Sequence, residues 1–295
     1  MLIPGIIASS KAAYQGIGTP WTARTLPAGD YGGVVGNSKI FVALGGTPTT
    51  KSAASSTDGI TWTSRTLPAN GYWGLAAYGN GVFAAIATNS TNGATSTDGI
   101  TWTSRTLSSS ANFQGMTFGG GLFVAVASSS SNVAMTSPDG ITWTNRTLPA
   151  TKNWTGVAYG NGTYVAVSSG STSAATSTDG INWTAQTLPG AAYGGKIAYG
   201  NGLFVSLGST TYSATSTDGV TWTARTKPNG FFNGFTFGGG LFVGVADSST
   251  LAITSPDGIT WTSRTLPSSS GWYGVAFGPN LYAAVAYTGQ LATAP

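Results

Sequence analysis

The chain has 295 residues, and only 7% of them are charged, with a net charge of +4; soluble proteins usually carry about 25% charged residues. Cysteine, histidine and glutamate do not occur, which excludes disulfides, thiol chemistry and ordinary zinc sites. We therefore expect no metal and no cofactor. The basic residues form no cluster of the kind that binds nucleic acid, and no apolar run approaches the ~20 residues of a membrane helix, so neither partner is expected.

The first 20 residues form a leader that repeats nowhere else in the chain. It begins with the apolar residues Leu2, Ile3, Pro4, Ile6 and Ile7. It lacks a basic n-region, so it is a poor signal peptide. We expect this segment to dock on a partner by adding to a sheet edge or filling a groove, or else to cover the protein's own surface.

A tryptophan recurs every 39 to 41 residues from position 21 onward, at Trp21, Trp62, Trp102, Trp143, Trp183, Trp222 and Trp261. A fixed period of this length is typical of a repeat architecture. Residues 1–20 are therefore assigned to the leader and residues 21–295 to one repeat domain.

Each period contains signals for four strands in a constant order. Residues 100–107 after the Asp-Gly pair alternate with a period of two, and a small-residue strand such as residues 156–159 follows. Next come a Gly-Asn-Gly or all-Gly turn, a continuous apolar run such as residues 122–127, and a third strand such as residues 92–96. Four strands per period of about 40 residues predict the blade of a β-propeller.

The turn before each tryptophan has the pattern Ser-x-Asp-Gly-x-x-Trp, as in residues 96–102. Asp accepts hydrogen bonds from backbone N–H groups ahead of it, and Gly tolerates positive φ. This pattern resembles the Asp-box, or bacterial neuraminidase repeat, and six of seven copies keep Ser, Asp, Gly and Trp. The resemblance implies a β-propeller with its Asp boxes at the blade periphery, away from the active sites of the sialidases that carry them.

The last period ends after a third strand, residues 290–294, without another Asp-Gly turn. The missing fourth strand can be supplied by residues 21–26. We therefore predict an all-β, seven-bladed β-propeller of four-stranded antiparallel blades, closed by pairing of the N- and C-terminal strands, which leaves no exposed sheet edge at the junction.

Loops on the face opposite the Asp-Gly turns vary most between repeats, and binding residues usually lie on such loops. Each blade also has an aromatic residue 10 or 11 positions after its tryptophan, and three blades double it. These aromatics predict either a ring of flat faces for sugars or packing between blades, and only one member of a pair can point inward. The candidate ligand-binding residues are Tyr72, Trp73, Trp154, Phe231, Trp272, Tyr273 and Lys196.

Lys196 is a candidate because other blades have Leu or Gly at the matching position. We expect its side chain either to project into the central channel, where an anionic group or a water would satisfy it, or to be solvated.

Hydrolysis is not expected, and no catalytic residue is assigned. The resemblance to sialidases implies an arginine triad, a tyrosine–glutamate pair and an aspartate, whereas glutamate is missing here and every arginine occupies the same repeated position. Ordinary glycosidases need two nearby carboxylates, and only Asp30 and Asp247, which fall in different blades, lie outside the Asp-Gly turns.

Residues 2–10 resemble N-terminal segments of structural proteins of tailed bacteriophages. This resemblance implies a non-catalytic virion protein, such as part of a tail or fibre, assembled in the host bacterial cytoplasm and attached to other virion proteins through its leader. Its propeller face would bind the host surface, with a glycan as the expected ligand. Two alternatives stay open: a capsid decoration or cement protein without a ligand, and a free lectin or assembly-scaffold propeller.

Overall fold

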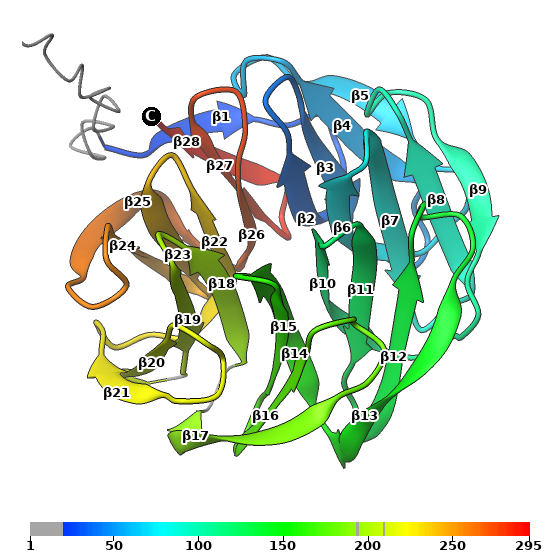
Figure 1. Cartoon of the computed structure of the whole chain (residues 1–295). Coiled ribbons are helices and arrows are strands. Elements are labelled where there is room, and N and C mark those ends of the chain that lie inside the picture. Colours follow the sequence, from blue (N-terminus) through cyan, green and yellow to red (C-terminus); the bar gives the residue numbers. More distant parts are fainter. Residues whose placement is uncertain (1–19, 193–194, 209) are drawn as a thin grey trace, which may run out of the picture.

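The computed structural model describes residues 20–192, 195–208 and 210–295. The leader residues Leu2, Ile3, Pro4, Ile6 and Ile7, for which docking was predicted, lie outside this range. The described residues form seven four-stranded antiparallel sheets arranged around a central axis (Figure 1). The predicted seven-bladed, all-β propeller is thereby confirmed.

The inner strands surround the axis, and those of neighbouring blades contact one another around the whole ring. They are β2 (Tyr31–Gly36), β6 (Tyr72–Gly79), β10 (Phe113–Gly119), β14 (Trp154–Gly160), β18 (Lys196–Gly200), β22 (Phe232–Gly238) and β26 (Trp272–Phe277). The second strands are buried on both faces, as their continuous apolar runs predicted. They are β3 (Phe41–Gly45), β7 (Val82–Thr88), β11 (Leu122–Ala127), β15 (Thr163–Ser168), β19 (Leu203–Leu207), β23 (Leu241–Ala246) and β27 (Tyr282–Ala286).

The third strands carry small residues, and each of the first six ends at the serine of an Asp-Gly turn. They are β4 (Ser52–Ser56), β8 (Asn92–Ser96), β12 (Ser131–Ser137), β16 (Ser171–Ser177), β20 (Tyr212–Ser216), β24 (Ser249–Ser255) and β28 (Gln290–Ala294). The outer strands are β1 (Thr22–Thr25), β5 (Thr63–Thr66), β9 (Thr103–Thr106), β13 (Thr144–Lys152), β17 (Thr184–Ala192), β21 (Thr223–Thr226) and β25 (Thr262–Ser270).

The ring closes through the two ends of the described chain. β1 pairs antiparallel with β28, with Thr22 opposite Thr293 and Thr25 opposite Gln290, and the two strands lie side by side in Figure 1. The seventh blade is therefore made of β26, β27, β28 and β1, as the sequence predicted.

The Asp-Gly turns have the hydrogen bonds that their sequence predicted. In the turn after β8, Asp98 Oδ1 accepts hydrogen bonds from the backbone N–H groups of Ile100 and Thr101, both at 2.8 Å. The Ser96 hydroxyl donates to the same oxygen at 2.9 Å and accepts from the Gly99 N–H at 2.9 Å, and Gly99 has a φ of 71°. Because these bonds occupy the turn, β9 begins only at Thr103 rather than at residue 100.

The repeated arginines tie the two outermost strands of a blade together. In each case the guanidinium Nε donates to a hydroxyl on the third strand, as from Arg105 to Thr95 at 2.9 Å and from Arg24 to Thr293 at 3.1 Å. Gln186 replaces the arginine in the fourth blade and donates to Thr176 at 3.1 Å. The arginines therefore have a structural role in their blades, and they are distributed around the periphery.

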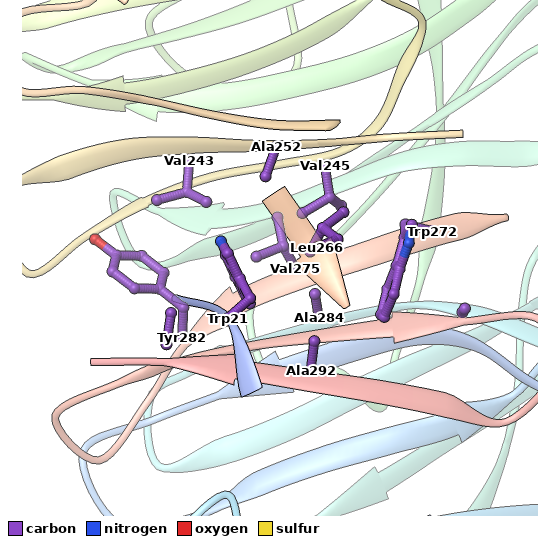
Figure 2. Packing of buried hydrophobic residues seen from close by; sticks show 12 residues of the cluster. Trp21, Val243, Val245, Ala252, Leu266, Trp272, Val275, Tyr282, Ala284 and Ala292 are labelled. Atoms are coloured by element: carbon purple, nitrogen blue, oxygen red, sulfur yellow. The ribbon is translucent and has the colours of Figure 1, made fainter. Parts of the chain in front are cut away.

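The core consists of apolar layers between adjacent blades. Figure 2 shows one such layer, in which Val243 and Val245 of β23 face Trp272, Val275 and Tyr282 of the next blade, with Trp21 completing the cluster. The inner strands also approach closely: a Cβ on Gly119 would lie 2.1 Å from the Tyr159 ring of the following blade. Neighbouring blades therefore interlock at this end of their inner strands.

Candidate ligand-binding site

The propeller has two kinds of face. The Asp-Gly turns and the turns between inner and second strands lie on one face, because antiparallel strands alternate in direction. The loops after the second strands and the connections from outer to inner strands lie on the other, which we call the cavity face. As predicted, this is where the blades differ most in sequence.

A cavity of about 220 Å³ lies at the cavity-face end of the central channel. Its lining residues come from several blades: Gly32, Gly46, Tyr72, Gly74, Leu75, Thr88, Phe113, Gln114, Lys196, Asn233, Tyr273 and Tyr287. A second cavity of about 170 Å³ continues along the channel, and Lys196, Asn233, Gln114 and Tyr273 line both. The two cavities therefore share a group of polar side chains.

Tyrosine side chains form the walls of the first cavity, at the cavity-face end of the channel. Tyr72 is 38% exposed and Tyr273 is 42% exposed. The rings of Tyr273 and Tyr287 lie 5.6 Å apart between centroids, and the Tyr287 hydroxyl donates to the carbonyl of Gly46 at 2.5 Å. Burial raises the pKa of Tyr287, and the neighbouring Tyr72, Asp30 and Tyr273 raise it further.

Glycines allow the backbone to approach closely beside these tyrosines. A Cβ on Gly46 would lie 2.7 Å from the backbone nitrogen of Gly32 and 3.1 Å from the Tyr287 ring. The first blade therefore brings two stretches of backbone together where the second and seventh blades present aromatic rings. The result is a cavity with aromatic walls and a partly backbone floor.

The predicted site residues divide into two groups. Tyr72, Tyr273 and Lys196 line the cavity together, and their role in ligand binding stays a prediction. Phe231 is 46% exposed, but it lies outside the lining of the cavity, and its carbonyl accepts a hydrogen bond from the Asp247 N–H at 2.8 Å.

Trp73, Trp154 and Trp272 have no exposed area, so they offer no face for a sugar to stack on. Trp73 is packed between Val42 and Leu44 of the first blade and Phe83 of its own blade. The indole N–H groups of the three tryptophans donate to backbone carbonyls four residues earlier, at 3.0 to 3.2 Å. Their prediction as stacking residues is corrected to packing between blades.

The same packing holds for the other described members of the aromatic series, Tyr31, Phe113 and Phe232, which are at most 3% exposed. Tyr193 lies outside the described residues. In each doubled pair one ring is buried and the other exposed, because successive side chains of a strand point to opposite faces.

Sequence reasoning missed Tyr287, Gln114 and Asn233 as lining residues. A signal was available for two of them: Gln114 and Asn233 directly precede the inner-strand glycines Gly115 and Gly234, in the register position that Tyr273 has before Gly274. Tyr287 belongs to the loop after β27 and had no comparable pattern.

The described residues contain no group of three His, Cys, Asp or Glu side chains close enough to share a metal ion. In the same part of the chain, no helix has the length and hydropathy needed to cross a bilayer.

Comparison with known proteins places the fold among solved β-propellers. A streptogramin B lyase structure has a TM-score of 0.80 at 12% identity, covering 93% of this chain and 97% of the other. A catalytically inactive virginiamycin B lyase from Staphylococcus aureus with quinupristin, in which one histidine is replaced by alanine, has a TM-score of 0.79 at 12% identity, with 93% and 98% covered. YCF48 bound to a D1 peptide has a TM-score of 0.71 at 15% identity, with 94% and 95% covered.

At these identities the likeness shows the fold alone. No family profile matches the chain, and no curated protein matches its sequence, so membership of the Asp-box family remains a prediction. Because two of these structures are of lyases, the comparison does not support the prediction that the chain is not an enzyme.

Proposed function

We propose that this chain is a non-catalytic carbohydrate-binding protein of a bacteriophage virion, with its ligand held in the tyrosine-walled cavity. The main observation in support of this proposal is that exposed aromatic rings and polar groups without hydrogen-bond partners lie around one cavity. They belong to Tyr72, Tyr273, Asn233 and Lys196. Among the described residues, the two tyrosine hydroxyls, the Asn233 amide and the Lys196 ammonium have no hydrogen-bond partner. Aromatic rings with a few polar groups suit a sugar, which has both an apolar face and hydroxyl groups.

The ionisable residues support binding rather than hydrolysis. The described lining contains no carboxylate, whereas glycosidases of the common type place two carboxylates around the scissile bond. Asp30 and Asp247 lie near the rim, where Asp247 raises the pKa of Tyr273 after the larger effect of burial, but they belong to connections of different blades. The lyase likeness gives no residue to carry over, because the residue replaced in the inactive lyase is a histidine and this chain has none.

The direction of β1 supports attachment through the leader. Outer strands begin on the face of the Asp-Gly turns and end on the cavity face, so Trp21, directly before β1, lies on the face opposite the cavity. A leader bound to a virion through Leu2, Ile3, Pro4, Ile6 and Ile7 would leave the cavity directed outward. Virion incorporation lost on deletion of residues 2–15, with the propeller still folded, is the expected result.

The binding proposal is tested on a glycan array with the full chain and two cavity variants. Tyr72→Ala and Tyr273→Ala should each weaken binding about tenfold or more, which corresponds to about 1.4 kcal/mol. Tyr78→Ala is a matched control, because Tyr78 is 37% exposed, close to the 38% of Tyr72, at the opposite end of the same strand. Absence of any bound glycan, or an equal loss in the control, would contradict a carbohydrate site here and favour a decoration protein.

A further inference from the structure

Lys196 has a position in its strand that no other blade fills with a charged residue. In the inner-strand register the matching residues are Gly33, Leu75, Gly115, Gly156, Gly234 and Gly274. The lysine side chain therefore enters a channel that the glycines leave open. Lys196 lines both the first cavity, at the cavity-face end of the channel, and the second cavity, which continues along it.

The ammonium group of Lys196 has neither a hydrogen-bond partner nor a counter-charge among the described residues. No described side chain or carbonyl forms a hydrogen bond with it, and no carboxylate belongs to the described lining of either cavity. Lys196 is half-buried, and burial lowers its pKa, as expected for a cation partly removed from water without a counter-charge. An anionic group bound beside it would relieve this cost.

Neutral donors surround the same space. Asn233 and the hydroxyl of Tyr273 line the cavity with Lys196 and lack partners among the described residues. Gln114 is partly engaged, because its amide nitrogen donates to Asn112 Oδ1 at 2.7 Å, and the Thr155 hydroxyl donates to the Gly195 carbonyl at 3.1 Å. The free donors together suit the two oxygens of one carboxylate.

We infer that the cavity selects ligands that carry a single carboxylate, held against Lys196, with the rest of the ligand between Tyr72 and Tyr273. This inference rests on the proposed carbohydrate site and specifies its ligand as an acidic sugar. A ligand with a single negative charge fits because the described lining supplies one cation, Lys196. A buried dianion would keep one negative charge without a positive partner. Asp30 near the rim also disfavours long polyanions.

The test compares acidic sugars with their neutral counterparts by calorimetry on the full chain. Glucuronic acid is paired with glucose, galacturonic acid with galactose, and acetate serves as a carboxylate without a sugar. The wild type should bind at least one acid ten- to a hundredfold more tightly than its neutral partner, the range expected for a charge-assisted hydrogen bond. Acetate should bind more weakly than that acid.

Three variants separate the role of Lys196 from general charge and folding effects. Lys196→Leu should remove the preference for the acid over its neutral partner, and leucine is tolerated at the matching position of β6. Lys196→Arg should retain most of the preference. Lys39→Leu, which removes one exposed positive charge from the opposite face, should change nothing.

The outcomes distinguish this inference from the proposed function. Equal binding of acid and neutral partner by the wild type, or a preference that survives in Lys196→Leu, would overturn the inference and leave the carbohydrate site standing. Acetate binding as tightly as the uronic acids would support the carboxylate site and refute the sugar. Binding of none of these probes would overturn the inference, whereas the proposed function is overturned only if the glycan array shows no bound glycan.

Discussion

Lys227 occupies a position that is leucine in the other six blades: Leu26, Leu67, Leu107, Leu148, Leu188 and Leu266. It is only 5% exposed. Its ammonium donates to the carbonyls of Thr210, Pro228 and Gly230 and lies 4.5 Å from the centroid of the Phe232 ring. Burial lowers its pKa from 10.5 to about 8, so this side chain should make the stability of the propeller depend on pH.

The sign follows from the two protonation states. Between pH 8 and 10.5 the unfolded chain holds the Lys227 proton more tightly than the folded one, so raising the pH stabilises the fold; below pH 8 the cost is fully present. A shift of this size corresponds to about 3 kcal/mol in total, with about 1 kcal/mol gained between pH 8.5 and 9.5. These are upper values, because the three carbonyls and the ring stabilise the ammonium.

The assay is urea unfolding at pH 7, 8.5 and 9.5. Lys227→Leu should lose this gain, since it restores the residue of the other blades and removes the titrating group. Lys51→Leu, at an exposed lysine, should keep the wild-type slope. Parallel pH dependences for the wild type and Lys227→Leu would refute the assignment of a lowered pKa to this lysine.

Three further changes, in an Asp-Gly turn, in the core between blades and in the closing strand, test what stabilises the propeller. Asp98→Ala should cost about 1–2 kcal/mol in urea unfolding, by loss of the turn's hydrogen bonds, and Asp98→Asn should cost less. Because backbone hydrogen bonds lower the pKa of Asp98, the advantage of the wild type over Asp98→Asn should shrink as the pH falls below about 4; an unchanged advantage at pH 3 would contradict this. Trp272→Ala should cost about 3–5 kcal/mol by leaving a cavity between blades, measured the same way, and a value below 1 would argue against its packing role. Removal of residues 290–295 should leave β1 without its partner and cause aggregation in size-exclusion chromatography, whereas removal of Pro295 alone should not.

Much of the fold was predictable because each blade repeats the same local signals. The apolar run at residues 122–127 matches β11 in both bounds, and the pairing of β1 with β28 followed from counting strands. The Ser-x-Asp-Gly turn occurs six times, so the hydrogen bonds predicted for one copy could be expected in the other five. Repetition supplied the evidence that one blade alone would not have given.

The candidate site was less predictable, because it depends on where the blades differ. The sequence showed that Tyr72 and Trp73 must point to opposite sides, but burial decided that Tyr72 faces the cavity. For Lys196 the sequence left two alternatives open, the channel or solvent, and the structure places it in the lining of both cavities. Tyr287 was missed because its approach to Gly46 joins two blades across the ring closure, a contact that no local pattern encodes.

Closure of the ring has a consequence for how the molecule is made. Arg24 hydrogen-bonds to Thr293, 269 positions further along the chain, so the first outer strand must wait through synthesis of nearly the whole domain before its partner exists. Bringing such distant segments together carries a larger entropic cost than any hairpin within a blade, and contacts of long range are slow to form. The blade that contains β1 can therefore be completed only after β28 has emerged from the ribosome. Until then, a nascent chain exposes an unpaired β edge to chaperones and to other nascent chains.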